Sequence, residues 1–243
     1  MPPSRIISLV PSLTELLFWL GAGDRVVART KFCTEPQGAV DSVPAIGGTK
    51  NPIIERIVAL QPDLVIANKE ENRREDIDAL RAAGLHVLLT DPNTVGEAVT
   101  MIRDIGWALG APERADELTA AIDSALCAIP SSRRVAVYAG VWHNPMMGLG
   151  SESYGNSLIE ACGGRNVMQR PRYPETSLGE LRTLAPELIL LPDEPFPFDA
   201  GHAALYGEVA PARVIDGKLL WWYGPRMPQA IRELSALFEE FQK

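Results

Sequence analysis

The stretch "ERIVALQPDLVIA" (residues 55–67) decides the fold, because a closely related stretch, "GELRTLAPELILL", occurs at residues 179–191. In register, Pro62 falls on Pro186, and an apolar run follows each proline. Proline cannot continue a helix, and a short run rich in Leu, Ile and Val is typical of a strand buried in a parallel sheet. Each copy is therefore predicted to be a helix, a proline stop and a buried strand.

Strands and helices alternate around these two copies. Arg5–Val10 is predicted to be a buried strand, and Ser12 with Glu15 has the spacing of a capping box that opens the first helix. A long helical stretch from Val95 to near Ile129 separates the copies, and "GAP" at 110–112 marks a break or kink in it. Further strands are expected at 25–28, 64–67, 86–90, 134–139, 166–168, 188–191, 213–215 and 219–222, and further helices at 52–60, 73–83, 155–162, 178–184 and 225–241.

This order predicts an α/β fold of two similar α/β lobes with parallel sheets, joined by one long backbone helix. The predicted boundaries are 1–93 for the N-terminal lobe, 94–130 for the connecting helical segment and 131–243 for the C-terminal lobe. The alternative is one doubly wound sheet that contains all the strands, in which the repeat reflects only recurring strand–helix units.

The composition excludes some classes of protein. The chain has 243 residues, of which 46% are hydrophobic and 22% charged, as in an ordinary folded protein. The formal net charge of −8 argues against nucleic-acid binding, which needs a basic face. No apolar run reaches the roughly 18 residues of a membrane-spanning helix. We therefore expect a protein that does not span a membrane. We also expect it to be a monomer.

The first residues, "MPPSRIISLVPS", do not have the basic region, apolar core and cleavage site of an export signal. The sequence as written is therefore predicted to be cytoplasmic. A periplasmic or other extracytoplasmic location is the alternative if a signal has been removed.

Four segments resemble one known family. They are "RIISLVPSLTELLFWLGAGDRVVART" (5–30), "VPAIGGTKNPIIERIVALQPDLVIA" (43–67), "GNSLIEACGGRNV" (155–167) and "ELRTLAPELILLP" (180–192). Together they resemble the substrate-binding proteins of vitamin B12 and ferric-siderophore ABC importers, the helical-backbone metal receptors. The resemblance implies two lobes bridged by one long helix, with the ligand held between the lobes.

The resemblance also implies how such a protein would dock to its transporter. In the family a surface Glu on each lobe docks with Arg pockets of the membrane permease. The matching position is Glu55 in the first lobe and Gly179 in the second, where the acid is the neighbouring Glu180. Some members join a Cys near position 162 to one in the last helix, where this chain has none.

Ligand sites of α/β lobes form in the loops beyond the carboxyl ends of the strands. In this chain those loops are rich in cationic and aromatic residues, which suit a large, flat, partly anionic ligand such as a corrinoid, a haem or a ferric chelate. The predicted ligand-binding residues are Ser12, Lys31, Cys33, Thr49, Lys50, Lys69, Glu70, Arg73, Trp142, Asn144, Met147, Arg172, Tyr173, Trp222, Tyr223 and Arg226.

Several of these loops have a simpler interpretation. "NKEENRR" (68–74) has the composition of a solvated helix start with an Asn cap, and "GGTKNP" (47–52) that of a plain turn. Trp221 and Trp222 adjoin in a predicted strand, so at most one of them is expected to face a ligand. Trp19 and Trp107 lie on predicted helices and are expected in the core.

His143 and Cys33 are the predicted metal ligands. His143 follows a strand and stands beside Trp142 and Met147, and imidazole and thioether groups suit iron, cobalt or copper; the alternative is a solvated loop histidine. Cys33 follows Lys31 by two residues, and a nearby cation would favour its thiolate.

The remaining cysteines and histidines are given structural interpretations. The three cysteines have neither a zinc nor a disulfide spacing, so Cys127 and Cys162 are predicted to be small buried hydrophobes. His86 is placed in a strand and His202 in a loop, neither with a partner in sequence.

Two functions follow from these features. The first is a non-enzymatic solute-binding protein for a corrinoid, haem or ferric chelate, with no intrinsic cofactor and with an ABC permease as partner. The second is an intracellular enzyme or metallocofactor-handling protein on the same fold, with Cys33, His143 and the carboxylates of residues 68–74 at its centre. The sequence contains no nucleophile elbow, phosphate loop or histidine pair at zinc spacing, which favours the first.

Overall fold

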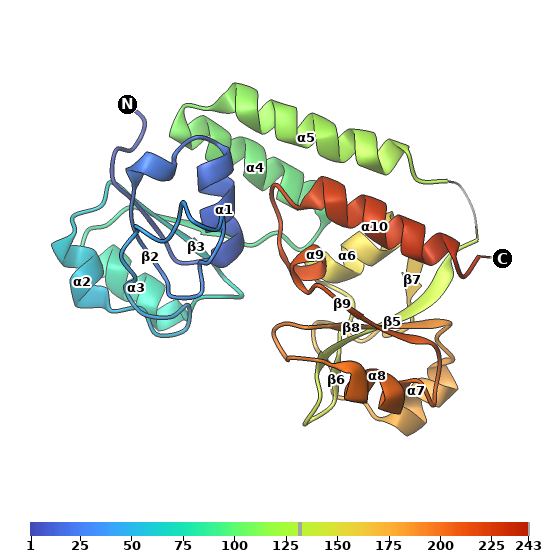
Figure 1. Cartoon of the computed structure of the whole chain (residues 1–243). Coiled ribbons are helices and arrows are strands. Elements are labelled where there is room, and N and C mark those ends of the chain that lie inside the picture. Colours follow the sequence, from blue (N-terminus) through green and yellow to red (C-terminus); the bar gives the residue numbers. More distant parts are fainter. Residues whose placement is uncertain (131–132, 243) are drawn as a thin grey trace. The chain divides into compact units, whose positions relative to one another are not determined.

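The computed structural model describes residues 1–130 and 133–242, shown as a ribbon in Figure 1. The described chain divides into two compact units. Unit 1 consists of Met1–Asp91, Val99–Thr119 and Tyr223–Pro225, and unit 2 consists of Pro92–Ala98, Ala120–Trp222 and Arg226–Lys243.

Unit 1 contains a four-stranded parallel sheet in the order β2–β1–β3–β4. The strands are β1 (Ile6–Ser8), β2 (Val26–Arg29), β3 (Leu64–Asn68) and β4 (Val87–Thr90), and the helical elements around them are α1 (Pro11–Trp19), η1 (Gly23–Arg25), α2 (Ile54–Ala59) and α3 (Arg74–Ala82). β1 and β3 are fully buried, as their apolar sequences predict.

The predicted capping box at the first helix is wrong. The N-cap of α1 is Val10, and Pro11 occupies the first turn. Proline fits there because its missing N–H would have had no partner within the helix. Ser12 therefore lies inside the helix and is buried.

Unit 2 contains a five-stranded sheet built on β5, with the path β6–β5–β8–β9 and β7 pairing with β5. All pairs are parallel except β5 with β6. The strands are β5 (Val135–Trp142), β6 (Met147–Gly148), β7 (Gly164–Asn166), β8 (Leu188–Pro192) and β9 (Ala212–Ile215), and the helices are α6 (Tyr154–Ala161), α7 (Leu178–Leu184), α8 (Ala200–Tyr206), α9 (Lys218–Trp221) and α10 (Met227–Glu239). The described residues thus form two sheets, which excludes the single doubly wound sheet.

The strand predicted at 219–222 is wrong, because this segment is helix α9. Asp216 initiates the turn: its side chain accepts from the Lys218 N–H at 2.9 Å, and its carbonyl accepts from the Leu219 N–H at 3.1 Å. The apolar run that suggested a strand instead places Leu219 and Leu220 in the interior.

The connecting segment contains two helices, α4 (Val95–Leu109) and α5 (Pro112–Cys127), so the break predicted at 110–112 is confirmed. Gly110 turns the chain between them with a φ of 71°. A Cβ placed on Gly106 would come within 2.4 Å of the Ala115 Cβ, so the two helices approach closely beside the turn. Trp107 was predicted to be in the core, but it is 74% exposed.

The two copies of the repeated stretch place an acid in the same role. In unit 1 one carboxylate oxygen of Asp63 accepts from the Ser4 N–H (2.8 Å), the Ser4 hydroxyl (2.7 Å) and the Arg5 N–H (2.9 Å). In unit 2 the matching Glu187 accepts from the Ala136 N–H (2.8 Å). Each acid precedes the repeat's strand and holds the start of the central strand beside it, β1 or β5.

Glu187 is expected to contribute pH-dependent stability. The Ala136 N–H, and then the paired Arg133, lower the pKa of Glu187 below its ordinary value of 4.5. A carboxyl whose pKa is lowered in the folded state stabilises the fold above its ordinary pKa, and this stabilisation is lost as the pH falls through the folded value. Glu187→Gln should therefore cost about 1 kcal/mol at pH 7, since the group is partly solvated.

Urea denaturation at pH 7 and pH 3 measures this difference. The deficit of Glu187→Gln should be present at pH 7 and shrink at pH 3. Glu208→Gln is the control, because its ion pair with Arg182 is exposed and 3.6 Å long. An equal deficit at both pH values would show that the charge of Glu187 is not the cause.

Candidate functional site

In unit 1 two buried asparagines hold the predicted ligand loops at the carboxyl edge of the sheet. The Asn72 amide donates to the carbonyls of Leu9 (3.3 Å) and Thr49 (2.9 Å), and its oxygen accepts from the Asn68 N–H (2.9 Å). The Asn68 amide donates to Thr90, and its oxygen accepts from the Glu70 N–H. This network joins the loops that follow β1, β3 and β4 to the 47–52 turn.

The helix-cap interpretation of 68–74 is wrong, because α3 has Arg73 as its N-cap and both asparagines are used within the loops. Residues 47–52 do form a turn: Gly48 and Asn51 exchange backbone hydrogen bonds of 3.3 Å, and Gly47 has a φ of 108°. The ligand-binding role of Thr49 and Lys50 in this turn stays a prediction.

Most of the predicted cations of unit 1 have partners in the same unit. Lys50 donates to the Glu70 carbonyl, Lys69 pairs with Asp91 at 2.6 Å, and Arg73 pairs with Asp76 at 2.9 Å. The ammonium group of Lys31 lies 5.0 Å from the ring centre of Phe32. Phe32 is 52% exposed. It was not among the predicted ligand-binding residues, although it lies in one of the loops from which those residues were chosen.

Glu71 is a further acid of this loop edge, which the sequence named only among the carboxylates of residues 68–74 and not among the ligand-binding residues. Burial raises the pKa of Glu71, and the charge of Lys50 opposes that shift.

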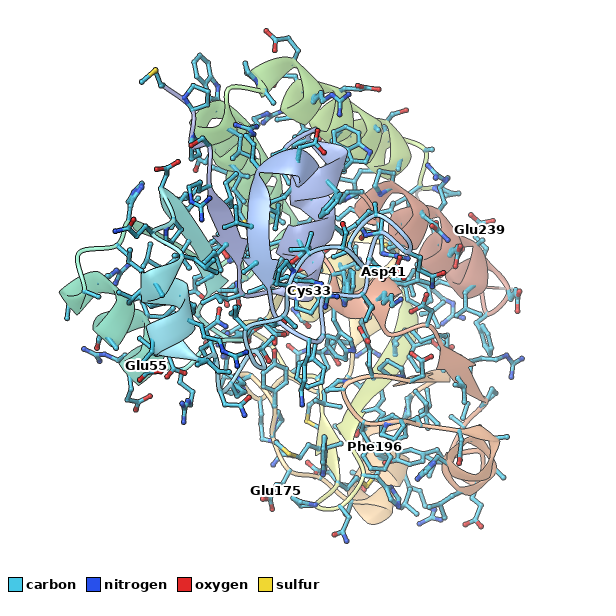
Figure 2. The ribbon with its side chains drawn as sticks, turned by 60° about the vertical axis from the view of Figure 1, so that its left-hand side comes forward. Cys33, Asp41, Glu55, Glu175, Phe196 and Glu239 are labelled. Atoms are coloured by element: carbon cyan, nitrogen blue, oxygen red, sulfur yellow. The ribbon has the colours of Figure 1, made fainter. Side chains whose placement is uncertain are left out.

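Cys33 lies inside unit 1, and the expectation of a reactive thiolate is wrong (Figure 2). Its side chain is fully buried, with the Thr30 hydroxyl 3.1 Å from its sulfur. Burial raises the pKa of the Cys33 thiol, because the interior disfavours the charged form. Lys31 is exposed and does not alter this direction. Cys33 thus resembles a packed core residue more than a metal ligand.

The other two cysteines differ from each other. Cys162 is buried, as predicted, and burial raises its pKa to about 12. Cys127 was predicted to be buried but is exposed near the end of α5. Cys127 lies on the face of α5 that is exposed to solvent.

A thiol-specific reagent should therefore react with one cysteine of the native protein. We expect Cys127 to be modified rapidly at pH 8, whereas Cys33 and Cys162 react only after denaturation, because the reagent attacks an accessible thiolate. Mass spectrometry of peptides after brief treatment identifies the labelled residue. Rapid labelling of Cys33 in the native protein would contradict its burial.

In unit 2 two loop segments form a hydrogen-bonded ladder. The Gly150 N–H donates to the Arg172 carbonyl (2.7 Å), the Arg172 N–H to the Ser151 carbonyl (2.7 Å), and the Thr176 N–H to the Met146 carbonyl (2.9 Å). Arg172 has a φ of 63°, a left-handed conformation that an Arg rarely adopts. The ladder thus holds Arg172 and Tyr173 in a strained, defined arrangement.

Aromatic side chains gather where β5 and β8 of unit 2 end. Trp142, 39% exposed, packs edge-on against Phe196 with ring centres 5.3 Å apart. Phe196 is labelled in Figure 2. His143 lies 4.7 Å from the ring of His202, and its Nδ1 is 3.5 Å from the Tyr206 hydroxyl. We call Trp142, His143, Phe196, Phe198, His202 and Tyr206 the aromatic cluster.

Two predictions about these histidines are wrong. His202 lies in α8 instead of a loop, where Asp199 forms a capping box with it and lies 2.7 Å from its Nδ1. His143 is a half-buried member of the aromatic cluster instead of a solvated residue. Across the described residues, no group of three or more His, Cys, Asp or Glu side chains is arranged to hold a metal ion.

Trp222 is buried in unit 2 and supports the loop that carries Arg226. Its indole N–H donates to the Glu194 carboxylate at 2.8 Å, and Lys218 and Arg226 lie 5.4 and 5.2 Å from its ring. Burial raises the pKa of Glu194, and the hydrogen bond from Trp222 lowers it. The strand alternation predicted for Trp221 and Trp222 is wrong, because Trp221 is the last residue of α9 and Trp222 is its C-cap. The Trp221 indole N–H donates to the Glu194 carbonyl at 2.5 Å.

The predicted ligand residues therefore separate by exposure. One group is exposed or half-buried and lies in the loops or, for Trp142 and Met147, at the adjoining strand ends: Lys31, Lys50, Lys69, Glu70, Arg73, Trp142, Asn144, Met147, Arg172, Tyr173 and Arg226. A second group is buried and supports those loops: Ser12, Cys33, Thr49, Trp222 and Tyr223.

The two predicted docking acids differ in their surroundings. Glu55 is exposed in the first turn of α2 (Figure 2). Glu180 is half-buried in the first turn of α7 and pairs with Arg170 at 2.8 Å. Among residues 1–130 and 133–242, none of the helices has both the length and the apolar character needed to cross a bilayer.

Comparison with known proteins shows the relationship of the chain. A model of the family described as "Periplasmic binding protein" matches residues 6–199. A vitamin B12-binding protein of Vibrio parahaemolyticus is 23% identical over 254 residues, covering 99% of this chain and 90% of the relative. Another, of Vibrio campbellii, is 26% identical over 194 residues, covering 77% and 70%.

Solved structures agree with the sequence comparisons. The periplasmic vitamin B12 binding protein BtuF of Vibrio cholerae matches with a TM-score of 0.86 at 21% identity, covering 100% of this chain and 99% of that one. The periplasmic heme-binding protein BhuT, solved in complex with two hemes, matches with a TM-score of 0.84 at 25% identity, covering both chains fully. The resemblance inferred from the four sequence segments is confirmed, and the chain belongs to the periplasmic binding protein family.

Proposed function

We propose that this protein is a non-enzymatic solute-binding protein for an intact metal chelate, with a corrinoid or a haem as the leading ligands and ferric chelates as the wider class. The observation that carries the proposal is the kind of side chain found at the carboxyl ends of the strands in each unit. Unit 2 presents an aromatic cluster beside a rigid ladder, and unit 1 presents exposed lysines at the carboxyl edge of its sheet.

These groups suit such a ligand physically. A macrocycle has two flat apolar faces and polar or anionic substituents at its rim. In unit 2, exposed Trp142 and half-buried Tyr173 offer rings for the faces, and Arg172 offers a cation for the rim. Relatives named for vitamin B12 and heme support both ligands. His143 is an imidazole of the aromatic cluster and would hold the metal of a bound chelate, to which it would supply a nitrogen ligand.

The family also supports a transport role. We propose delivery to an ABC permease, with Glu55 as a docking acid because it is exposed at the start of α2. The names of the relatives favour an extracytoplasmic site of action, in place of the cytoplasmic location predicted from the first residues. The alternative of a metallocofactor-handling enzyme is weakened because Cys33 is buried with a raised pKa.

Titration of the purified chain with haem, cobalamin and a ferric siderophore tests the proposal. We expect saturable binding of at least one of them with a Kd in the micromolar range or below, and no binding of a sugar used as control. Trp142→Ala should weaken binding about tenfold, which corresponds to about 1.4 kcal/mol. Trp107→Ala, which removes an exposed tryptophan of α4, should leave binding unchanged.

The outcomes are distinct. Failure of every chelate to bind would contradict the function. Equal affinities of the Trp142→Ala and Trp107→Ala variants would contradict the placement of the ligand on the aromatic cluster, while leaving the function intact.

A further inference from the structure

Glu180 and Arg170 form the centre of a compact network in unit 2. The Arg170 guanidinium donates to both carboxylate oxygens of Glu180, at 2.8 and 3.0 Å, and to the Glu175 carbonyl at 2.8 Å. The Thr176 hydroxyl donates to the same carboxylate at 2.8 Å. We call Arg170, Thr176 and Glu180 the clamp.

We propose that the clamp is a positioning device for the ligand loop, and that Glu180 is a positioning residue instead of a free docking acid. This inference rests on the proposed function, because it assigns a role in holding the loop that carries Arg172 and Tyr173. The clamp residues bracket that loop on both sides in the sequence.

The loop needs external support because its conformation is strained. Arg172 has a φ of 63°, and such a backbone persists only where surrounding bonds determine it. The ladder to residues 146–151 supplies bonds on one side of the loop. The Arg172 side chain adds donations to the Asn93 amide oxygen (2.8 Å) and the Glu152 carbonyl (2.9 Å).

The clamp supplies the support on the other side from a rigid helix. Glu180 lies in the first turn of α7, where Ser177 is the N-cap and accepts from the Glu180 N–H. Leu181 next to it is fully buried and fixes the helix to the interior. The carboxylate therefore holds the end of the loop to α7, directly at Thr176 and through Arg170 at Glu175.

The predicted docking acids, Glu55 and Glu180, consequently differ in whether their carboxylates already have partners. In the first lobe Glu55 is exposed. In the second lobe Glu180 already accepts three hydrogen bonds from Arg170 and Thr176. A cation from a partner protein would compete with Arg170 and Thr176 for this carboxylate, and loss of their hydrogen bonds would release the ligand loop.

The test compares Glu180→Ala and Glu180→Gln with the control Glu208→Ala. Glu208 is not part of the clamp; it follows α8 and pairs with Arg182 of α7 at 3.6 Å. Backbone hydrogen exchange of the ligand-free protein is measured at Arg172 and Thr176, whose N–H groups are bonded in the ladder. Dissociation of haem, or of cobalamin if that binds more tightly, is then measured by stopped-flow absorbance.

We expect Glu180→Ala to exchange at Arg172 and Thr176 at least tenfold faster and to release the ligand at least fivefold faster. Glu180→Gln should restore most of both properties, because its amide oxygen still accepts from Arg170 and Thr176. Glu208→Ala should match the wild type in both measurements.

Unchanged exchange in Glu180→Ala would overturn the clamp. Faster exchange with unchanged ligand release would overturn its role in positioning. If the wild-type protein binds none of the chelates, the proposed function fails and the role in binding fails with it, while the exchange measurement still decides whether the clamp holds the loop.

Discussion

Gly150→Ala is expected to abolish tight ligand binding and to lower the stability of the protein. A Cβ at this position would lie 1.9 Å from the Arg170 carbonyl oxygen and 2.9 Å from that of Arg172. Both are backbone atoms of the opposing segment, so the ladder must separate to admit the methyl group. We expect a loss of about 3 kcal/mol in the free energy of unfolding, as for overpacking that displaces backbone.

Gly179→Ala is the matched control for this prediction. It adds the same methyl group to unit 2, but at an exposed position where the nearest atom, the Ser177 hydroxyl oxygen, is 3.8 Å away. Alanine is favoured over glycine in a helix, so this variant should be as stable as the wild type or slightly more so. Thermal denaturation and chelate titration of both variants measure the difference. A Gly150→Ala protein with wild-type affinity would show that the ladder does not shape the ligand loop.

Trp222→Ala is expected to have the largest effect on stability of the substitutions in the loops of unit 2. Removing a buried tryptophan leaves a cavity and costs about 3–5 kcal/mol. It also removes the donor to the Glu194 carboxylate and the ring that Lys218 and Arg226 lie over. Trp222→Phe keeps a ring but loses the indole N–H, and should cost about 1–3 kcal/mol.

Trp142→Ala provides the opposite pattern. Because Trp142 is 39% exposed, its removal should change stability little and ligand affinity strongly. Urea denaturation and chelate titration of Trp222→Ala and Trp142→Ala therefore distinguish a residue that supports the fold from a residue that contacts the ligand. If Trp222→Ala unfolds at the same urea concentration as the wild type, the assignment of Trp222 as a buried support is wrong.

The two-lobed fold was predictable because its signal is local and repeated. The proline in each copy ends a helix, and the apolar runs after Pro62 and Pro186 become the buried strands β3 and β8. The acids of the two copies, Asp63 and Glu187, also proved equivalent in function, since each holds the start of the neighbouring strand. The alignment of the two copies and the position of proline in each are therefore enough to predict these units, without knowledge of contacts between distant residues.

The side-chain environments of the site were less predictable, because they depend on contacts far apart in the chain. Lys31 lies two residues from Cys33, yet burial decides the pKa of the thiol. His143 and His202 have ring centres 4.7 Å apart, although 58 residues separate them in the sequence, and only the fold of unit 2 reveals the pair. The helix at 218–221 depends on one aspartate, whereas the apolar pattern alone favoured a strand.

The most direct test of the central claim is native mass spectrometry of the wild-type protein after loading with haem or with cobalamin, followed by recovery of the ligand under denaturing conditions. A binding protein for an intact chelate predicts a saturable complex with that chelate and recovery of the ligand with its mass unchanged. Absence of any complex, or recovery of a demetallated or chemically altered ligand, would contradict the account.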